Sequence, residues 1–218
     1  MDINQITEEL ERQLLSYVYI LEYRFRYFDG LSQSIEHFFP TYGSKELVGY
    51  LKEKRFIYEK QINPTTRQWC LTSKGRERIK VIMAGGVFDI LHVGHLETLE
   101  AARALGDVLI VIIARDGTVR KLKKRQAITP EELRLRLIQS LKSVDIAVLG
   151  HLDNFVTVIE EFRPDIVALG YDQERFGVQL AQQLTERKLN QIEVQRLTIQ
   201  VSNIKSSKIV QLIQDLGM

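Results

Sequence analysis

Cysteine, proline and long hydrophobic runs are scarce in this chain of 218 residues. The single cysteine, Cys70, excludes an internal disulfide and is typical of proteins in a reducing compartment. The longest apolar run, Val108–Ala114, is far shorter than the roughly 20 residues that a membrane-spanning helix needs. The first ten residues are polar and acidic, unlike a secretory signal. We therefore expect a cytoplasmic protein with no membrane contact.

The net charge of +2 hides an uneven distribution. Residues 1–44 carry 3 basic and 7 acidic side chains, a net of −4, whereas residues 45–80 carry 10 basic and 4 acidic, a net of +6. Residues 81–218 carry 17 of each sign. A basic surplus confined to one segment suits contact with an anion or with nucleic acid, and it is equally compatible with a solvated face.

The first third of the chain predicts helices followed by a hairpin. Apolar spacing and turn residues indicate helices at residues 6–27, 34–39 and 44–54, strands at 56–61 and 68–71, and one helical turn from Thr72 or Ser73. This order, with its closing Leu71-Thr72-Ser73-Lys74-Gly75, resembles a winged helix-turn-helix domain over residues 1–78. The resemblance implies binding of duplex DNA through residues 44–54 and the hairpin. A module for packing or dimerisation is the alternative.

Residues 79–218 have a different pattern, in which nearly continuous apolar strands alternate with helices. We expect strands at residues 80–88, 108–114, 146–150, 165–170 and 191–197, with helices at 94–105, 130–141, 154–162, 173–188 and 206–216. Such alternation predicts an α/β fold with a Rossmann-like parallel sheet covered on both faces. The chain would then combine this larger domain with the smaller N-terminal one.

Glycines and histidines meet where the first of these strands ends. The stretch runs from Gly85 through Gly86, Val87, Phe88 and Asp89 to His92 and His95. In open α/β sheets ligands bind at this edge, glycine lets backbone N–H groups approach a phosphate, and a helix N-terminus attracts anions. Two imidazoles three residues apart could donate to phosphate oxygens. A metal site or two structural histidines are the alternatives.

This segment resembles the signature of the cytidylyltransferase-like nucleotidyltransferases, G-x-F-D followed by H-x-G-H, and later segments continue the likeness. The resemblance implies a catalytic role for His92, His95, Lys123 and Arg134. It implies contacts with the acceptor phosphate for Arg115, Asp116, Lys121 and Lys123. It implies nucleotide binding by Gly86, Val87, Phe88, His92, His95, Gly170, Asp172, Ser206 and Ser207. A solvated basic loop and a simple serine helix cap are the alternatives for the lysines and serines.

The implied reaction is a direct displacement. A phosphate oxygen of the acceptor attacks the α-phosphorus of ATP or CTP, and pyrophosphate leaves, so catalysis is mostly positioning and charge stabilisation. Mg²⁺ is expected on the triphosphate, held chiefly by phosphate oxygens and water. Asp89 is a possible ligand of that metal, or it could brace its own loop by accepting backbone hydrogen bonds.

The choice of acceptor depends on finer resemblance. Glycerol-3-phosphate cytidylyltransferases carry a terminal R-T-E-G-I-S-T-T signature, and Gln200 stands where their arginine would be. Residues 114–125 and 164–173 look more like archaeal FAD synthases, which implies ATP and FMN as substrates. A CTP-dependent cytidylyltransferase acting on a small phosphoalcohol stays open, as does a transcription regulator that senses a nucleotide or flavin. Aromatic residues between Tyr17 and Phe28 also suggest a homodimer.

Overall fold

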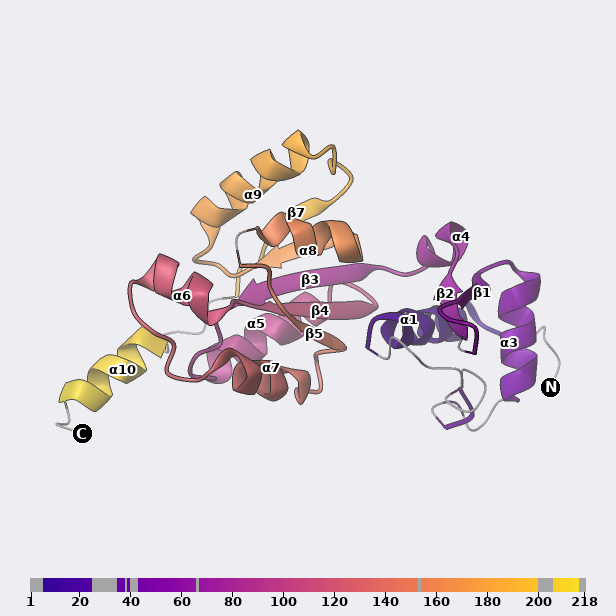
Figure 1. Cartoon of the computed structure of the whole chain (residues 1–218), viewed down its shortest axis with the longest axis horizontal. Coiled ribbons are helices and arrows are strands. Elements are labelled where there is room, and N and C mark those ends of the chain that lie inside the picture. Colours follow the sequence, from indigo (N-terminus) through magenta and orange to yellow (C-terminus); the bar gives the residue numbers. More distant parts are fainter. Residues whose placement is uncertain are drawn as a thin grey trace. The chain divides into compact units, whose positions relative to one another are not determined.

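The computed structural model describes residues 6–24, 35–37, 39, 43–65, 67–152, 154–199 and 206–215. The chain divides into two compact units, Met1–Ile79 and Lys80–Met218, each with its own core (Figure 1). Within the described residues, no helix combines the length and the apolar character that crossing a bilayer demands.

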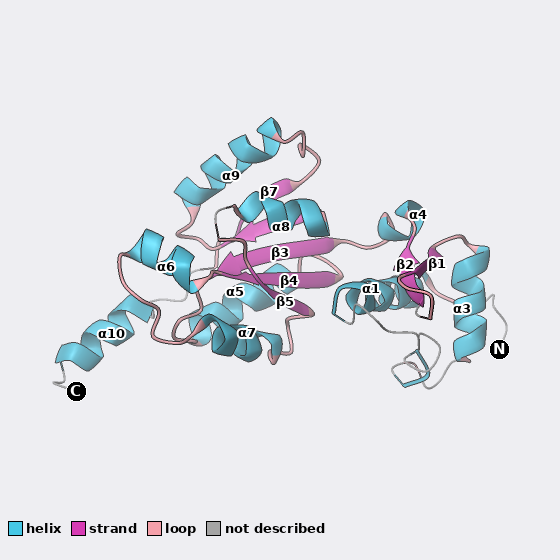
Figure 2. Cartoon of the chain, viewed as in Figure 1, coloured by secondary structure: helices cyan, strands magenta, loops and turns pink. Residues whose placement is uncertain are grey.

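The N-terminal unit packs helices against a two-stranded antiparallel sheet (Figure 2). Its helices are α1 (Glu8–Arg24), α3 (Ser44–Glu53) and α4 (Ser73–Arg76), and residues 35–37 are also helical. The hairpin pairs β1 (Ile57–Gln61) with β2 (Arg67–Leu71). These elements lie close to the expected ranges, while Pro40 and residues 25–34 fall outside the described residues.

Leucines on one side of α1 and α3 build the core of this unit. Leu14, Leu15, Leu47 and Leu51 are fully buried or nearly so. Glu11 is also buried, where its carboxylate accepts hydrogen bonds from the Tyr50 hydroxyl and from Arg78. A buried carboxylate needs such partners, because an unpaired charge loses its hydration without compensation.

The turn after α3 is held tightly against the start of α4. The Thr72 hydroxyl accepts from the Gly75 amide at 3.1 Å and donates to the Arg55 carbonyl at 2.7 Å. Gly75 leaves no room for a side chain, because a Cβ there would lie 2.2 Å from the Phe56 carbonyl oxygen. Thr72 therefore caps α4, one of the two residues expected to start this helical turn.

The second unit is a five-stranded parallel sheet with the strand order β5-β4-β3-β6-β7. Its strands are β3 (Val81–Gly86), β4 (Val108–Ile113), β5 (Ile146–Leu149), β6 (Ile166–Leu169) and β7 (Glu193–Arg196). The whole of β4 is buried, as expected for a central strand covered on both faces. The α/β Rossmann-like prediction is confirmed.

Helices cover both faces of this sheet. Figure 1 shows α5 (Val93–Arg103) and α7 (Glu131–Gln139) on one face, with α8 (Phe155–Phe162) and α9 (Glu174–Glu186) on the other. The remaining helices are α6 (Asp116–Lys123) and α10 (Ser206–Asp215). The sequence predicted a basic loop here, but the segment forms helix α6, which buries the Val119 side chain.

Three aspartates fix the strands at the amino edge of the sheet. Asp107, Asp145 and Asp165 each precede a strand and accept the backbone N–H at the start of the neighbouring strand, at 2.6 to 2.7 Å. In chain order, β4 and β5 are added on one side of β3, and β6 and β7 on the other. The loops after the neighbouring strands β3 and β6 therefore diverge at the opposite, carboxyl edge of the sheet. Ligands of open α/β sheets bind in that crevice.

Gly75 and Gly49 offer a paired test of this packing. Gly75→Ala should destabilise the N-terminal unit by about 2–3 kcal/mol, because the backbone carbonyl of Phe56 cannot rotate away from the new methyl group. Gly49→Ala is the control, because a Cβ there meets nothing within 4 Å and alanine favours a helix interior. Thermal unfolding measures both variants. A Gly75→Ala protein as stable as wild type would contradict the packing described.

Candidate active site

The two motif histidines meet at the start of α5. His92 is the N-cap residue, and the His95 amide donates to the His92 carbonyl at 2.9 Å. Their rings stack with centroids 3.9 Å apart and 26° between the planes. Phe88 packs edge-on against His95 at 5.2 Å. The pair therefore lies at the carboxyl edge of β3, beside the positive end of a helix dipole.

Both imidazoles are neutral at pH 7. Burial lowers the pKa of His92. Burial lowers the pKa of His95 to about 4, helped by repulsion from His92 when that ring is protonated and from Lys123, although Asp172 opposes this. The Nδ1 atom of each ring is buried and has no hydrogen-bond partner among the described residues. Buried polar atoms are normally paired, so these two nitrogens indicate a site that a ligand completes.

The loop between β3 and the histidines depends on a glycine and an unusual backbone angle. Phe88 has a φ of 53°, in the left-handed region that side chains other than glycine seldom adopt. Its ring lies on Gly86, where a Cβ would come within 2.7 Å of it. The carbonyl of Val87 accepts a hydrogen bond from the Arg134 guanidinium. Gly86 thus permits the turn that brings Phe88 against His95.

Asp89 braces this loop against the segment that leads into α7. Its carboxylate accepts from the amides of Ile128 and Thr129 at 2.7 and 3.0 Å, and pairs with Arg125 at 2.7 Å. Burial alone would raise the pKa of Asp89, but the bonds from Thr129, Arg125 and Ile128 outweigh it and lower the pKa. Of the two roles that the sequence left open, these contacts favour bracing, because both oxygens are already engaged.

No cluster of three His, Cys, Asp or Glu side chains that could hold a metal ion exists among the residues described. A protein-built metal cage is thus absent from this part of the chain.

Arg134 has a different place from the one predicted. We expected it to face the substrate, but its side chain is fully buried. Its guanidinium donates to the carbonyls of Val87, Ala114 and Thr129 at 2.6 to 2.8 Å, and to the Asp116 carboxylate at 2.5 Å. The prediction that Arg134 contacts the reacting groups is therefore corrected. It positions the loops after β3 and β4 and the entry to α7.

Arg115 and Asp116, expected at the acceptor phosphate, are also tied to the protein. Arg115 donates to the Gly150 carbonyl and pairs with Glu131 at 2.7 Å. The Asp116 amide donates to the other Glu131 oxygen at 2.6 Å. Sequence reasoning missed Glu131, because an acidic residue in a first helical turn is common and gives no sign of a distant partner. Arg115 stays partly exposed at the rim of the site.

Helix α6 presents the basic run on its exposed side. Arg120, Lys121, Lys123 and Lys124 are all exposed, and the positive charge of Lys123 reaches His95. On the other side of the crevice, the loop after β6 carries Gly170 and Asp172, and Asp172 also acts on His95. Lys123 and Asp172 thus lie near enough to the His95 imidazole for their charges to act on it, and their shared role in one site stays a prediction.

The remaining predicted residues are less defined. The Gly170 amide donates to the Gln173 side chain at 2.7 Å, a partner that the sequence did not suggest. Ser206 and Ser207 begin α10, but their side chains lie outside what the structure describes, as does Gln200. The contact of this helix start with phosphates therefore stays a prediction.

Comparison with known proteins converges on this unit. Residues 83–212 match the model of the family described as cytidylyltransferase-like. The FAD synthase of Aciduliprofundum boonei is 47% identical over 116 residues, covering 53% of this chain and 76% of that protein. The FAD synthase of Thermoplasma acidophilum is 44% identical over 133 residues, covering 59% and 89%. The crystal structure of a lipopolysaccharide core biosynthesis protein from Thermoplasma volcanium is 38% identical, with a TM-score of 0.53, covering 56% and 99%.

Replacement of Arg134 by lysine tests its positioning role. Arg134→Lys keeps the charge but cannot span four acceptors with one ammonium group, so we expect a loss of about 3 kcal/mol and a fall in Tm of about 10 °C. Arg136→Lys on the exposed side of the same helix is the matched control and should change Tm by less than about 2 °C. Equal Tm values for the two variants would contradict the network.

Proposed function

Because the chain belongs to the cytidylyltransferase-like family, we propose that it is an FAD synthase, which transfers AMP from ATP to FMN and releases pyrophosphate. The observation that carries the proposal is the pair of stacked, neutral histidines at the start of α5, with their buried nitrogens unpartnered. The identity of 42 to 47% with four FAD synthases favours ATP and FMN over other substrates of the family.

In the proposed reaction, a phosphate oxygen of FMN attacks the α-phosphorus of ATP. The bond from that phosphorus to the oxygen of pyrophosphate breaks, and the electron pair leaves with pyrophosphate. The nucleophile is already an anion, so the site needs no strong general base. His92 and His95 would each donate one hydrogen bond to the phosphate oxygens on which charge grows, and the start of α5 adds its dipole.

The basic side of α6 supplies a second set of contacts. Lys123 acts on His95 through its charge, so an anion beside that imidazole would also be near the ammonium group. We assign Lys121, Lys123 and the exposed part of Arg115 to the phosphates of FMN and ATP, and the start of α10 at Ser206 and Ser207 to the β- and γ-phosphates.

A divalent metal, which we propose to be Mg²⁺, would enter with the nucleotide. It would neutralise charge on the triphosphate and on the leaving pyrophosphate. Asp89 is unsuited to holding it, because its oxygens already accept three hydrogen bonds from the protein.

Chromatography of flavin products tests the proposed activity. The purified protein incubated with Mg²⁺, FMN and ATP should form FAD and pyrophosphate in equal amounts, and CTP should not replace ATP. Pyrophosphate released only from CTP with glycerol 3-phosphate would instead identify a cytidylyltransferase. The absence of any product with every acceptor would favour a nucleotide-sensing regulator.

In the same assay, His95→Ala should lower turnover by about a hundredfold, because a donor to the transition-state charge is lost. Its Tm should stay close to that of wild type, because the imidazole makes no hydrogen bond that the fold needs. Lys142→Ala, an exposed substitution at the amino edge of the sheet, is the control and should leave turnover unchanged. A His95→Ala enzyme within a few-fold of wild type would overturn the assignment of the site.

We also propose a homodimer, now for a reason different from the aromatic residues of α1. Tyr19 is only 2% exposed and Tyr17 packs on Phe39, while Phe25, Tyr27 and Phe28 lie outside the described residues. Instead, Leu133 and Leu137 stand one helical turn apart on α7 and are 54% and 43% exposed, and Ile128, in the segment before α7, is exposed too.

We expect sedimentation equilibrium to give twice the 25.3 kDa chain mass, and Leu137→Glu to give the monomer, because a charge in the interface would be desolvated. Wild-type protein that sediments only as a monomer would exclude the dimer. Lys142→Glu, another change at an exposed position of this unit, should leave the mass unchanged.

Duplex DNA is the partner that we propose for the N-terminal unit. Its support is the net charge of +6 over residues 45–80 and the helix–hairpin order of the elements. This contact is separate from FAD synthesis, since every residue assigned to catalysis belongs to the other unit.

A further inference from the structure

An exposed leucine follows β5 at the carboxyl edge of the sheet. Leu152 is 54% exposed, although its side chain is large and apolar. The Thr118 hydroxyl donates to the Leu152 carbonyl at 3.2 Å, and a Cβ on Gly117 would lie 3.2 Å from the Leu152 side chain. Leu152 therefore rests against the first turn of α6.

Side chains that we assign to phosphates lie in the same place. Arg115 donates to the Gly150 carbonyl at 3.0 Å, two residues before Leu152. Lys121 lies on α6 one helical turn after Thr118, the residue that bonds to Leu152. An acceptor whose phosphate meets Arg115 and Lys121 would thus have the loop of Leu152 next to its remaining atoms.

Two phenylalanine rings continue the apolar surface toward β3. Phe155 is the first residue of α8, and its ring lies on Gly85, where a Cβ would come within 3.0 Å of it. Phe176 of α9 packs edge-on against Phe155, with ring centroids 5.4 Å apart and 84° between the planes. Both rings belong to residues that are partly exposed. We call Leu152, Phe155 and Phe176 the apolar wall.

Asn154 adds a hydrogen-bond donor to this surface, since it lies in sequence between Leu152 and Phe155. Its side-chain oxygen accepts from the Val156 amide at 2.9 Å and so caps α8. The nitrogen of the same carboxamide has no hydrogen-bond partner among the residues that the structure describes. The segment therefore offers a polar group with spare donor capacity beside apolar side chains.

A flat ring with an apolar edge and carbonyl oxygens suits such a surface. Sites for small molecules are mostly apolar, with a few polar groups that fix the orientation of the ligand. The isoalloxazine ring of FMN has a dimethylbenzene edge, which aromatic and aliphatic side chains can cover, and a pyrimidine edge with carbonyls. Glycerol 3-phosphate has no apolar part that would cover Leu152. The wall thus favours a flavin over a small phosphoalcohol.

We infer that the apolar wall binds the isoalloxazine ring of FMN, that Leu152 selects a flavin as acceptor, and that the Asn154 carboxamide donates to a ring carbonyl. The inference rests on the proposed FAD synthesis and names the surface that recognises the acceptor in it. The wall would hold the ring equally well before and during phosphoryl transfer. It therefore acts on the binding of FMN and not on the chemical step.

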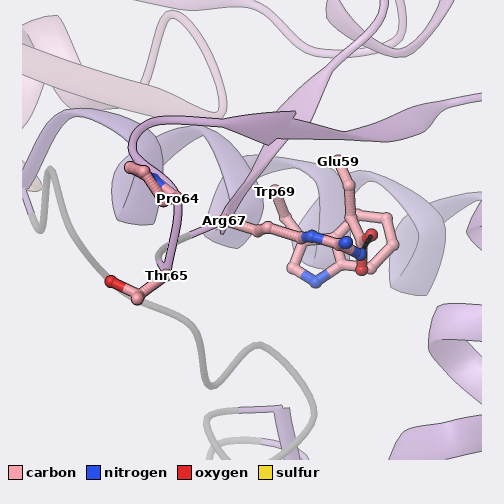
Figure 3. Close-up of a pocket in the computed structure, with 5 residues that line it drawn as sticks. All are labelled: Glu59, Pro64, Thr65, Arg67 and Trp69. Atoms are coloured by element: carbon pink, nitrogen blue, oxygen red, sulfur yellow. Dashed lines mark hydrogen bonds and ion pairs between the residues drawn. The ribbon is translucent and has the colours of Figure 1, made fainter.

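The hairpin of the N-terminal unit is the competing surface for a flat ligand. Figure 3 shows a hollow there of about 370 Å³, lined by Glu59, Pro64, Thr65, Arg67 and Trp69. The Lys52 ammonium already lies over the Trp69 ring, 4.5 Å from its centre, and Arg67 pairs with Glu59 at 3.2 Å. These contacts engage the groups that a flavin would need, and no residue assigned to catalysis belongs to this unit.

Flavin fluorescence tests the wall directly. The full chain is titrated into FMN and, separately, into riboflavin, which has the same ring without the phosphate. Leu152→Ser should weaken the binding of both by the same factor, about tenfold, because apolar contact with the ring is lost. A loss confined to FMN would show that Leu152 acts through the phosphate and would overturn the inference.

Val178→Ser is the matched control for the loss of an exposed apolar side chain. Val178 is 69% exposed on α9, two residues beyond Phe176 and therefore on another side of the helix. This variant should bind both flavins as wild type does. Equal weakening in Val178→Ser and Leu152→Ser would overturn the role of the wall.

Asn154→Asp separates the donor from the helix cap. Aspartate keeps an oxygen that can accept from the Val156 amide, so the Tm should not fall. It removes the donor and sets a carboxylate against a ring carbonyl, so flavin binding should weaken several-fold. A variant that binds flavin as well as wild type would overturn the hydrogen bond from Asn154.

Steady-state kinetics adds a readout that a merely structural fault would not reproduce. In Leu152→Ser the KM for FMN should rise about tenfold, while kcat and the KM for ATP stay within about twofold of wild type. A fall in kcat with unchanged KM for FMN would overturn the inference, as would an equal rise in both KM values.

The outcomes separate the wall from the activity. Wild-type protein that neither binds FMN nor forms FAD overturns the proposed function and the wall with it. Wild-type protein that forms FAD, together with a Leu152→Ser variant that binds FMN equally well, overturns the wall alone. Flavin binding that is lost in Trp69→Leu but kept in Leu152→Ser would place the flavin on the hairpin and would likewise overturn the inference.

Discussion

The buried guanidinium of Arg134 holds the catalytic edge of the sheet in one arrangement. It reaches the carbonyls of Val87 and Ala114, which follow β3 and β4, and that of Thr129, which precedes α7. Carbonyls at the ends of parallel strands have no strand partner beyond the sheet, so a single planar cation can satisfy several of them at once. Asp116 supplies the counter-charge, without which a fully buried arginine would be strongly unfavourable.

The histidines depend on this arrangement through Val87 and Phe88. Arg134 orients the Val87 carbonyl, the next residue adopts a left-handed backbone, and its ring then packs on both Gly86 and His95. The same burial that holds the imidazoles keeps them neutral. Neutral imidazoles beside a basic helix add no further repulsion to an already positive site. They can still donate hydrogen bonds when a triphosphate arrives.

Much of the C-terminal fold could be predicted because buried parallel strands read as continuous apolar runs, as Val108–Ile113 does. For the site, the sequence alone predicted the part formed by residues that lie close together in the chain, from Gly86 to His95. Contacts between segments that are distant in the sequence could not be predicted. Nothing near Arg134 in the sequence indicates that it is buried or that it meets Val87, and Glu131 gives no sign of Arg115. The sequence did not predict helix α6, because most of its residues are charged or polar and the buried Val119 gives too weak an apolar pattern.

The two units handle positive charge in opposite ways, and the contrast bears on what each one binds. In the catalytic unit, Arg115, Arg125 and Arg134 are paired with carboxylates that fix loops, and the exposed lysines of α6 stand beside them. A small triphosphate needs that combination, because its few oxygens must be met at defined positions. In the N-terminal unit, Lys52, Lys54 and Lys74 instead lie over aromatic rings, and none of the three pairs with a carboxylate among the described residues. A long polyanion tolerates such spacing, because it offers phosphates along its whole length and gains affinity from the counterions it releases.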